Sequence, residues 1–238
     1  MKIGVFAYNF KHKKTQDGLL NLFLNGYKVD CVLAADWRKL NISRSEIRIS
    51  PKDLHHVHPK KIAERLNIPY HVVEHDSNEC EELIKNYDLD VGIILGARIL
   101  KKNIISGFNI GVINLHPGLI PQNRGLDNIK WAILKGFEQG VTIHFITEEI
   151  DFGPIIIQRK IKIYEDDELL DIYLRITNLE QALMIESLKI LESGERDFEI
   201  PKEEGNYFKA VPYEKEKNLF KKFEEYKKMM SKNPPTFE

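Results

Sequence analysis

The stretch Val112-Ile113-Asn114-Leu115-His116-Pro117 is an apolar run that predicts a buried β-strand, although an amide and an imidazole interrupt it. Asn114 and His116 lie two positions apart, so their side chains share one face of such a strand. A second apolar run, residues 141–146, is followed by the carboxylate of Asp151. Core strands that lead into polar groups are typical of a functional site rather than of a core. The two runs therefore predict both a sheet and the place of its site.

Short β-branched runs alternate with helical patterns along most of the chain, which indicates βαβ units and a mostly parallel sheet. The expected strands are residues 3–7, 29–35, 70–73, 91–95, 112–115, 141–146 and 155–161. The expected helices are residues 15–24, 59–66, 77–87, 126–135 and about 168–191. We therefore expect an α/β domain over residues 1–194, with a Rossmann-like sheet and flanking helices. Ligands bind such sheets in a crevice at the carboxyl ends of the strands.

A different pattern follows Gly194 and predicts a small C-terminal extension over residues 195–238. Residues 198–200 and 207–211, separated by a polar stretch with a glycine, predict a β-hairpin. Residues 213–230 predict a helix with an apolar stripe formed by Leu219, Phe220, Phe223 and Tyr226. Such a stripe suits packing on the core, and it suits a homodimer interface equally well.

Composition limits the partners. The chain has 238 residues, of which 42% are hydrophobic and 30% charged, and its formal net charge is −1. A balanced charge weighs against a nucleic-acid partner or an anionic membrane surface. The N-terminus lacks the pattern of a secretory leader, and no apolar run approaches the roughly 20 residues that cross a bilayer. We expect a cytoplasmic protein.

Two further features of the sequence bear on its chemistry: a group of histidines and a long stretch without a helix or strand pattern. His55, His56 and His58 lie close together, but no Cys or carboxylate with ligand spacing accompanies them, so we expect no metal site. Residues 37–57 form the longest stretch without a clear helix or strand pattern, and such loops in compact domains are often functional.

An amide, an imidazole and a carboxylate together suit acyl transfer. The Asn114 amide and a protonated His116 can both donate to an oxygen that becomes negative in a tetrahedral intermediate. Asp151 can favour the imidazolium and accept the proton of an attacking amine. No Ser or Cys nucleophile accompanies them, so transfer without an acyl-enzyme is expected. From the residues alone, a helix cap for Asn114 and His116 and a turn for Asp151 remain open.

Residues 113–121 with Arg124 and Gly125 closely resemble the signature of the folate-dependent formyltransferases. So do residues 140–146, which lead into residues 149–154. The resemblance implies a formyltransferase domain that moves the formyl group of 10-formyltetrahydrofolate onto an amine. By position it makes Asn114, His116 and Asp151 the catalytic residues. One departure is Gly118, because the family usually has Ser after His-Pro.

The resemblance also implies two binding regions. The wall of the folate pocket would be formed by Ala97, Arg98, Ile99 and Leu100, and backbone groups for the pterin would come from Thr147, Glu148, Glu149 and Ile150. The acceptor would lie beside Pro117, Gly118 and Gly125, with its diphosphate near Lys11, Lys14 or Arg124 and its base stacked on Tyr207 or Phe208.

The family has branches that use different amines. The methionyl-tRNA branch adds a C-terminal domain, whereas only a short segment follows Gly194 here. The purine branch has a Gly-rich turn after its first strand, whereas residues 8–11 of this chain contain no glycine. The remaining branch formylates nucleotide-linked amino sugars. We therefore expect a UDP- or dTDP-linked amino sugar, for a surface glycan such as pseudaminic acid or another 4-amino-4,6-dideoxy sugar. A phosphoribosylglycinamide formyltransferase and a non-catalytic folate-binding module remain alternatives. The sugar, its nucleotide, the amine position and the oligomeric state stay open.

Overall fold

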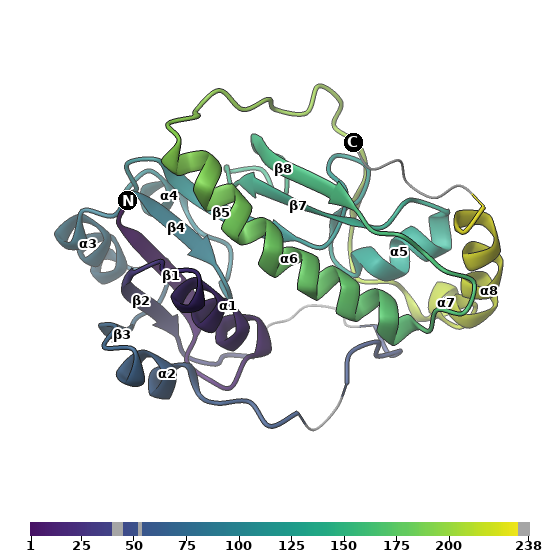
Figure 1. The fold of residues 1–238 in the computed structure, drawn as a ribbon, viewed down its shortest axis with the longest axis horizontal. Coiled ribbons are helices and arrows are strands. Elements are labelled where there is room, and N and C mark those ends of the chain that lie inside the picture. The colour runs from purple at the N-terminus through teal and green to yellow at the C-terminus, as the bar shows by residue number, and fades with distance from the viewer. Residues whose placement is uncertain (40–44, 52–53, 233–238) are drawn as a thin grey trace.

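The fold is built on one mixed sheet of seven strands in the order β3-β2-β1-β4-β5-β7-β8 (Figure 1). The computed structural model describes residues 1–39, 45–51 and 54–232. The strands are β1 (Ile3–Tyr8), β2 (Val29–Ala35), β3 (Tyr70–Val72), β4 (Val91–Ile94), β5 (Gly111–His116), β7 (Gly140–Phe145) and β8 (Ile155–Lys160). β3, β2, β1, β4 and β5 run parallel, whereas β7 is antiparallel to β5 and to β8. The expected α/β fold with a mostly parallel sheet is confirmed.

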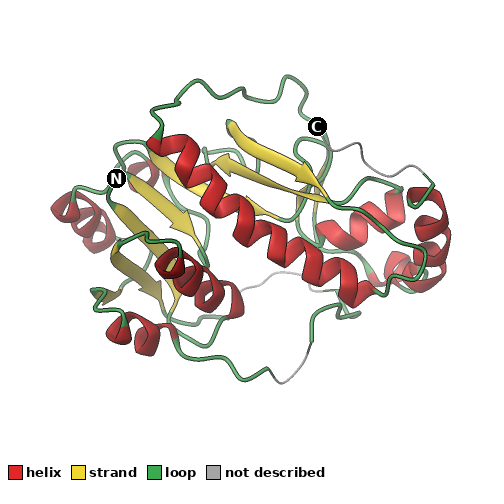
Figure 2. Cartoon of the chain, in the orientation of Figure 1, coloured by secondary structure: helices red, strands yellow, loops and turns green. Residues whose placement is uncertain are grey.

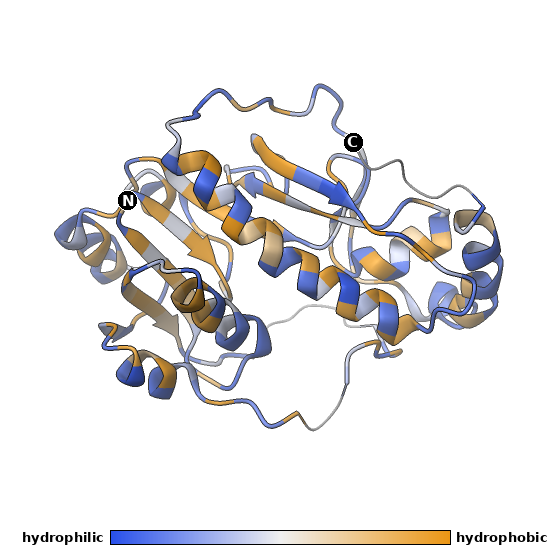
Figure 3. Ribbon diagram, in the orientation of Figure 1, coloured by the Kyte–Doolittle hydropathy of each residue, from blue (hydrophilic) through white to orange (hydrophobic). Residues whose placement is uncertain are grey.

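Helices cover both faces of the sheet (Figure 2). They are α1 (Lys13–Leu24), α2 (Pro59–Arg65), α3 (Asn78–Tyr87), α4 (Lys102–Ile105), α5 (Asn128–Lys135), α6 (Leu169–Glu192), α7 (Tyr213–Glu216) and α8 (Leu219–Met230). β1 shows how the layers meet, because Val5 and Ala7 pack with α1 and α6 while Phe6 packs with α3 and α4. Strands that are buried on both faces must be apolar on both, which explains the continuous apolar runs in the sequence. The long helix α6 shows alternating hydrophobic and hydrophilic bands, as expected for a helix with one buried face (Figure 3).

Local signals explain where helices begin and end. The side chain of Ser77 accepts a hydrogen bond from the backbone N–H of Cys80 (3.2 Å) and starts α3. A capping box joins Glu168 and Asp171 at the start of α6. Gly136, with φ of 72°, ends α5 in the left-handed conformation that glycine adopts at little cost. Among the described residues, no helix is both long enough and apolar enough to cross a membrane.

The predicted C-terminal hairpin is wrong. Residues 198–200 form no strand with residues 207–211. Instead, β9 (Tyr207–Phe208) pairs in parallel with β6 (Arg124–Gly125), and the carbonyl of Glu199 accepts from the backbone N–H of Ile155 at the start of β8 (3.0 Å). Both segments thus find partners distant in the sequence, and these replace the local pairing that the pattern suggested.

The predicted C-terminal helix is interrupted at Lys217 and Asn218, which separate α7 from α8. α8 lies beside α5 at one end of the molecule (Figure 1). Leu219, Phe223 and Tyr226 are buried in the main hydrophobic core, whereas Phe220 is 59% exposed. Most of the expected stripe therefore packs within the chain, and the homodimer and the division of the chain at residue 194 stay predictions.

Candidate active site

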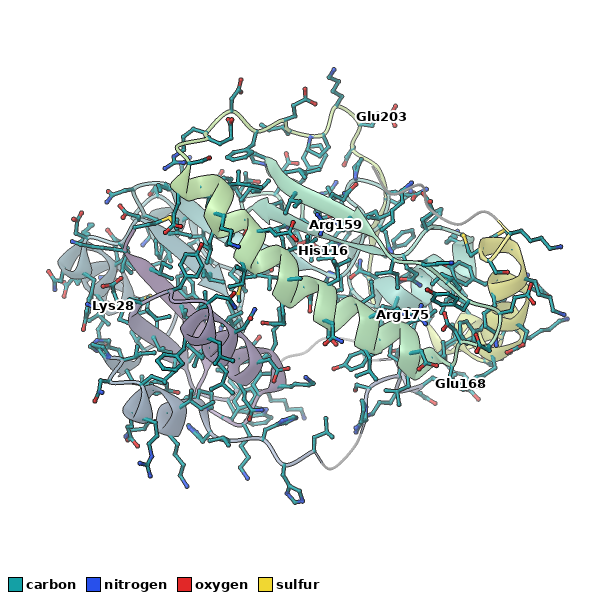
Figure 4. All side chains as sticks on the ribbon, in the orientation of Figure 1. Lys28, His116, Arg159, Glu168, Arg175 and Glu203 are labelled. Atoms are coloured by element: carbon teal, nitrogen blue, oxygen red, sulfur yellow. The ribbon has the colours of Figure 1, made fainter. Side chains whose placement is uncertain are left out.

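The predicted catalytic residues come together on one face of β5. Asn114 Nδ2 donates to Asp151 Oδ1 (3.3 Å). His116 Nδ1 lies 3.5 Å from Asp151 Oδ2, and that same oxygen accepts from the backbone N–H of Gly125 (3.0 Å). The arrangement puts a carboxylate within reach of both the amide and the imidazole. His116 lies near the centre of the molecule (Figure 4).

Asp151 reaches this face because its loop folds back over the sheet. β7 runs antiparallel to β5, so its end at Phe145 pairs with Ile113 rather than with His116. The return is tight: a Cβ added at Gly153 would lie 1.8 Å from the carbonyl oxygen of Phe145. Asp151 itself has a positive φ of 49°, which is uncommon for a residue other than glycine and frequent at functional sites.

His116 is almost fully buried and has an acceptor beside each ring nitrogen. Its side chain is 3% exposed. Nε2 donates to the carbonyl oxygen of Asn123 (2.8 Å), and Nδ1 faces Asp151. Each ring nitrogen thus faces an oxygen atom, and these two contacts fix the orientation of the imidazole. The Asn123 carbonyl also accepts from Asn128 Nδ2 (2.8 Å), which fixes its position.

Gly118 makes this contact geometrically feasible. A Cβ at this position would lie 2.6 Å from the Asn123 carbonyl oxygen and 2.8 Å from His116 Nε2. Real Cβ atoms do not approach other atoms so closely, and the first obstacle is backbone. The departure from the family's usual Ser therefore has a physical reason in this chain.

His144 belongs to the site, and the sequence analysis did not single it out. It lies opposite Asn114 across β5 and β7 and is fully buried. Burial, together with the nearby His116, lowers the pKa of His144 to about 4. The neutral ring donates from Nδ1 to the Phe145 carbonyl (2.9 Å), so Nε2 is left to accept from Asn114 Nδ2 (3.3 Å). His144 was present in the quoted motif, but its role depends on the antiparallel register, which the sequence pattern does not show.

The segments predicted to bind folate are linked to each other. Lys102, just after the 97–100 segment, forms an ion pair with Glu148 (3.2 Å). Ile99 and Ile150 expose 76% and 42% of their surface, whereas Leu100 is buried. The Ala97 carbonyl accepts from the Tyr8 hydroxyl (2.7 Å). Arg98 is bound to Glu74 and to the Asp36 carbonyl, which directs its guanidinium toward β2 and β3.

The loop of residues 147–150 is braced from within and from Arg124. The backbone N–H of Glu149 donates to Thr147 Oγ1 (3.2 Å). The guanidinium of Arg124 donates to the Ile150 carbonyl through Nε (3.1 Å) and Nη2 (2.8 Å). Its Nη1 donates to the Glu204 carbonyl (2.8 Å). Arg124 thus ties the loop that carries Asp151 to the C-terminal segment.

A cavity of about 890 Å³ lies between α1, residues 45–50, the start of α5 and α6; Pro117 lines it, whereas the predicted catalytic residues Asn114, His116 and Asp151 do not. Pro117 is the next residue after His116. Asn128 also lines the cavity, and its side chain donates to the Asn123 carbonyl, the partner of His116. Lys14 also lines the cavity; its Nζ donates to the Leu115 carbonyl (2.7 Å) and pairs with Glu180 (2.8 Å). His12 lies in the wall, where burial and the nearby Lys14 lower its pKa to about 4.

The other predicted substrate residues lie outside this wall. Lys11 is exposed, and Tyr207 is 48% exposed. Phe208 stacks on Trp131 with ring centroids 4.7 Å apart, and a Cβ at Gly125 would meet the Phe208 carbonyl at 2.0 Å. Phe208, Gly125 and Arg124 therefore serve the packing of the C-terminal segment, and contact of any of these residues with a substrate stays a prediction.

The described residues offer no obvious nucleophile or metal centre. Cys31 and Cys80 are buried, and burial raises the pKa of each thiol to about 12. In residues 1–39, 45–51 and 54–232, no three His, Cys, Asp or Glu side chains cluster in a way that could hold a metal ion. His58, from the histidine-rich stretch, contacts the Asn9 carbonyl through Nε2 (3.2 Å).

A Rossmann-like sheet that carries a buried amide, imidazole and carboxylate has the groups expected of an α/β protein that transfers acyl groups. Comparison with known families agrees with this class. The model of the family described as formyl transferase matches residues 5–188. The chain belongs to the formyl transferase family.

Individual relatives differ in the acceptor that their names give. Methionyl-tRNA formyltransferase of Chlorobium chlorochromatii is 34% identical over 133 residues, which are 55% of this chain and 42% of that protein. The dTDP-4-amino-4,6-dideoxyglucose formyltransferase of Mycobacterium bovis is 31% identical over 156 residues, 66% of this chain and 61% of that protein. The chain thus matches less than two thirds of the length of either curated relative. A solved N-formyltransferase from Helicobacter canadensis, in complex with folinic acid and dTDP-3-aminofucose, shares the fold, with a TM-score of 0.62 and 21% identity over 87% of this chain and 70% of that one.

Proposed function

We propose that this protein transfers the formyl group of 10-formyltetrahydrofolate to the primary amine of a nucleotide-linked amino sugar. The observation that carries the proposal is the convergence of Asn114, His116 and Asp151 beside a cavity that begins at Pro117. The cavity, at about 890 Å³, lies in the size range of small-molecule sites and is large enough for a nucleotide sugar.

The residues present fit the folate donor. Exposed apolar side chains, Ile99 and Ile150, stand on two segments that the Lys102–Glu148 ion pair links. A flat heteroaromatic ring suits such an apolar surface, and the backbone of residues 147–150 carries the polar groups that orient it. When bound, 10-formyltetrahydrofolate supplies the formyl carbon that the amine attacks.

Each side chain of the site has its own role in the proposed formyl transfer. Asn114 Nδ2 exchanges its hydrogen bond to Asp151 Oδ1 for one to the carbonyl oxygen as that oxygen becomes negative. His116, when protonated, stabilises the same oxygen through its positive charge, since its ring nitrogens face Asn123 and Asp151. Asp151 accepts the proton that the attacking amine loses and passes it to the departing folate nitrogen as the bond between that nitrogen and the formyl carbon breaks. His144, neutral because its pKa is about 4, accepts one amide hydrogen of Asn114 and leaves the other directed toward Asp151. The products are a formamide and the deformylated folate.

The choice of acceptor follows from two relatives that are linked to nucleotide amino sugars. The Mycobacterium bovis relative is named for a dTDP-linked 4-amino-4,6-dideoxy sugar, and the Helicobacter canadensis structure holds a dTDP-linked amino sugar. We extend this class of acceptor to the present chain, where the formylated sugar would serve a surface glycan. A nucleotide sugar is neither nucleic acid nor lipid, in keeping with the net charge of −1.

The proposal is tested by release of tetrahydrofolate with a panel of amines. The panel contains UDP- and dTDP-linked 3-amino and 4-amino sugars, phosphoribosylglycinamide and methionyl-tRNA. We expect turnover with an amino sugar alone, and turnover with one of the other amines instead would replace the proposed acceptor. Asn114→Ala should lower kcat roughly a hundredfold or more, because it removes an oxyanion donor. Asn109→Ala is the matched control, since in the described structure the Asn109 side-chain amide donates to Asp88 and Asp90, away from the site.

A further inference from the structure

One wall of the cavity is held in place by a buried ion pair that the proposed chemistry does not use. Residues 45–50 form that wall, and they are far in the sequence from α5, α6 and the C-terminal helices. Lys130 of α5 lines the same cavity. Its partner is Glu216, the last residue of α7.

The pair binds the wall at three successive residues. Lys130 Nζ contacts Glu216 Oε1 (2.6 Å) and donates to Ser45 Oγ (2.6 Å) and to the Ile47 carbonyl. The other carboxylate oxygen, Glu216 Oε2, accepts from the backbone N–H of Glu46 (2.6 Å). Together the two side chains join α5, α7 and residues 45–47 in one network.

The network is withdrawn from water. The Lys130 side chain is 4% exposed and the Glu216 side chain is fully buried. Burial opposes the charge on Glu216, but hydrogen bonds from Lys130 and from the backbone of Glu46 and Ile47 outweigh it, so the pKa of Glu216 is lowered. A buried ion pair is poor evidence of net stabilisation, because desolvation offsets most of the attraction. Its hydrogen bonds to an otherwise irregular segment point to another role.

We propose that Lys130 and Glu216 are positioning residues that fix residues 45–47 and thereby set the shape of the acceptor cavity. This inference rests on the proposed function, since it takes the cavity as the acceptor site. The pair touches neither the catalytic residues nor the folate segments in any hydrogen bond of the described structure. Its loss should therefore affect the acceptor and leave the formyl donor unaffected.

The experiment separates positioning from stability. Lys130→Met and Glu216→Leu each leave one buried charge unpaired, and both should lower Tm and raise the KM for the acceptor. In the double variant, two apolar side chains replace the pair, which should restore most of the Tm. The hydrogen bonds to Ser45, Glu46 and Ile47 are still absent, so the acceptor KM should remain raised about tenfold or more. The KM for 10-formyltetrahydrofolate and the kcat at saturating acceptor should match the wild type.

Lys222→Ala with Glu225→Ala is the control, because this pair in α8 is about half exposed on both sides and contacts no cavity residue. It should change neither Tm nor either KM appreciably. A double variant of the buried pair with the wild-type acceptor KM would overturn the inference.

Hydrogen exchange at the Glu46 amide reports on the wall without any acceptor. Exchange should be faster in the double variant than in the wild type, and equal rates would also overturn the inference. If the wild type formylates no amine in the panel, the proposed function fails, whereas the exchange experiment still decides whether the pair holds the wall. If it formylates an amine other than a sugar, the KM comparison is made with that amine.

Discussion

Gly118→Ser restores the residue that the family usually carries after His-Pro, yet we expect it to impair this chain. The new Cβ would lie 2.6 Å from the Asn123 carbonyl oxygen and 2.8 Å from His116 Nε2. The carbonyl cannot yield easily, because Asn128 Nδ2 holds it (2.8 Å) and the next residue, Arg124, is bound through its backbone N–H to Asn206. The imidazole of His116 is therefore the group that must move.

The size of the effect follows from these contacts. Forcing an extra atom into a packed site costs about 1–3 kcal/mol. In a protein of this size each kcal/mol corresponds to about 2–4 °C, so Tm should fall by ~2–12 °C. A displaced His116 loses its place beside Asp151 and no longer stabilises the oxyanion, and the loss of such stabilisation lowers kcat roughly 10²- to 10³-fold. The folate segments are not touched, so the KM for the donor should stay the same.

Tetrahydrofolate release and a thermal melt of the same preparations measure both quantities. Gly107→Ala is the control, because its nearest neighbour is the end of the Ile84 side chain at 3.1 Å, away from the site. That control should keep the wild-type kcat. If Gly118→Ser also keeps the wild-type kcat and Tm, the contact between Asn123 and His116 does not have the role that we assign to it.

Three other predictions concern the same site. Asp151→Asn keeps the shape of the side chain but removes the proton acceptor. We expect kcat to fall on the order of 10²- to 10⁴-fold while the KM for the formyl donor stays the same. Unchanged turnover would exclude a catalytic role for Asp151. The pKa of His144 is about 4 in the folded protein against its ordinary value of 6.5, so the unfolded chain binds the extra proton first on acidification. Stability should therefore fall as pH drops from about 6.5 to about 4. His144→Gln should flatten this part of a plot of Tm against pH. An identical slope in the variant would contradict the lowered pKa of His144. Arg124→Met removes hydrogen bonds to the Ile150 and Glu204 carbonyls, and we expect lower kcat and a loss of about 1–3 kcal/mol of stability. A raised acceptor KM at unchanged kcat would instead favour the diphosphate role that the sequence suggested.

The sequence predicted the sheet well because each of its strands is a local apolar run. Val5, Ala7 and Phe6 illustrate the reason: both faces of β1 are buried, so the run is continuous and easy to recognise. Strand direction is not local. β7 is antiparallel to β5, so the end of β7 at Phe145 lies opposite Ile113 and not beside His116. Asp151 meets His116 because the loop folds back, held by Gly153 and by Arg124.

The C-terminal segment shows the opposite case, in which a clear local pattern was overruled. Residues 198–200 and 207–211 have the alternation of a hairpin, but Glu199 bonds to β8 and Tyr207–Phe208 pairs with Arg124–Gly125. The local pattern records which residues favour extended backbone. It carries no information on which distant backbone they meet, and here the distant partners prevailed. For the same reason the sequence pattern did not reveal the roles of His144 and of the Lys130–Glu216 pair. Both roles depend on contacts between residues that are distant in the sequence.

The C-terminal segment lies mostly beyond the part of the chain that matches the family, residues 5–188, yet it touches both halves of the site. Through Glu204 it fixes Arg124, which holds the loop of Asp151. Through Glu216 it fixes residues 45–47, which wall the cavity. Leu219, Phe223 and Tyr226 share the main hydrophobic core with the sheet. Substitutions in this segment could therefore change the acceptor while the three catalytic side chains stay as they are. Glu216 is the residue at which that separation should be easiest to measure, because it bonds the cavity wall directly and, within the described structure, forms no hydrogen bond or ion pair with the loop of Asp151.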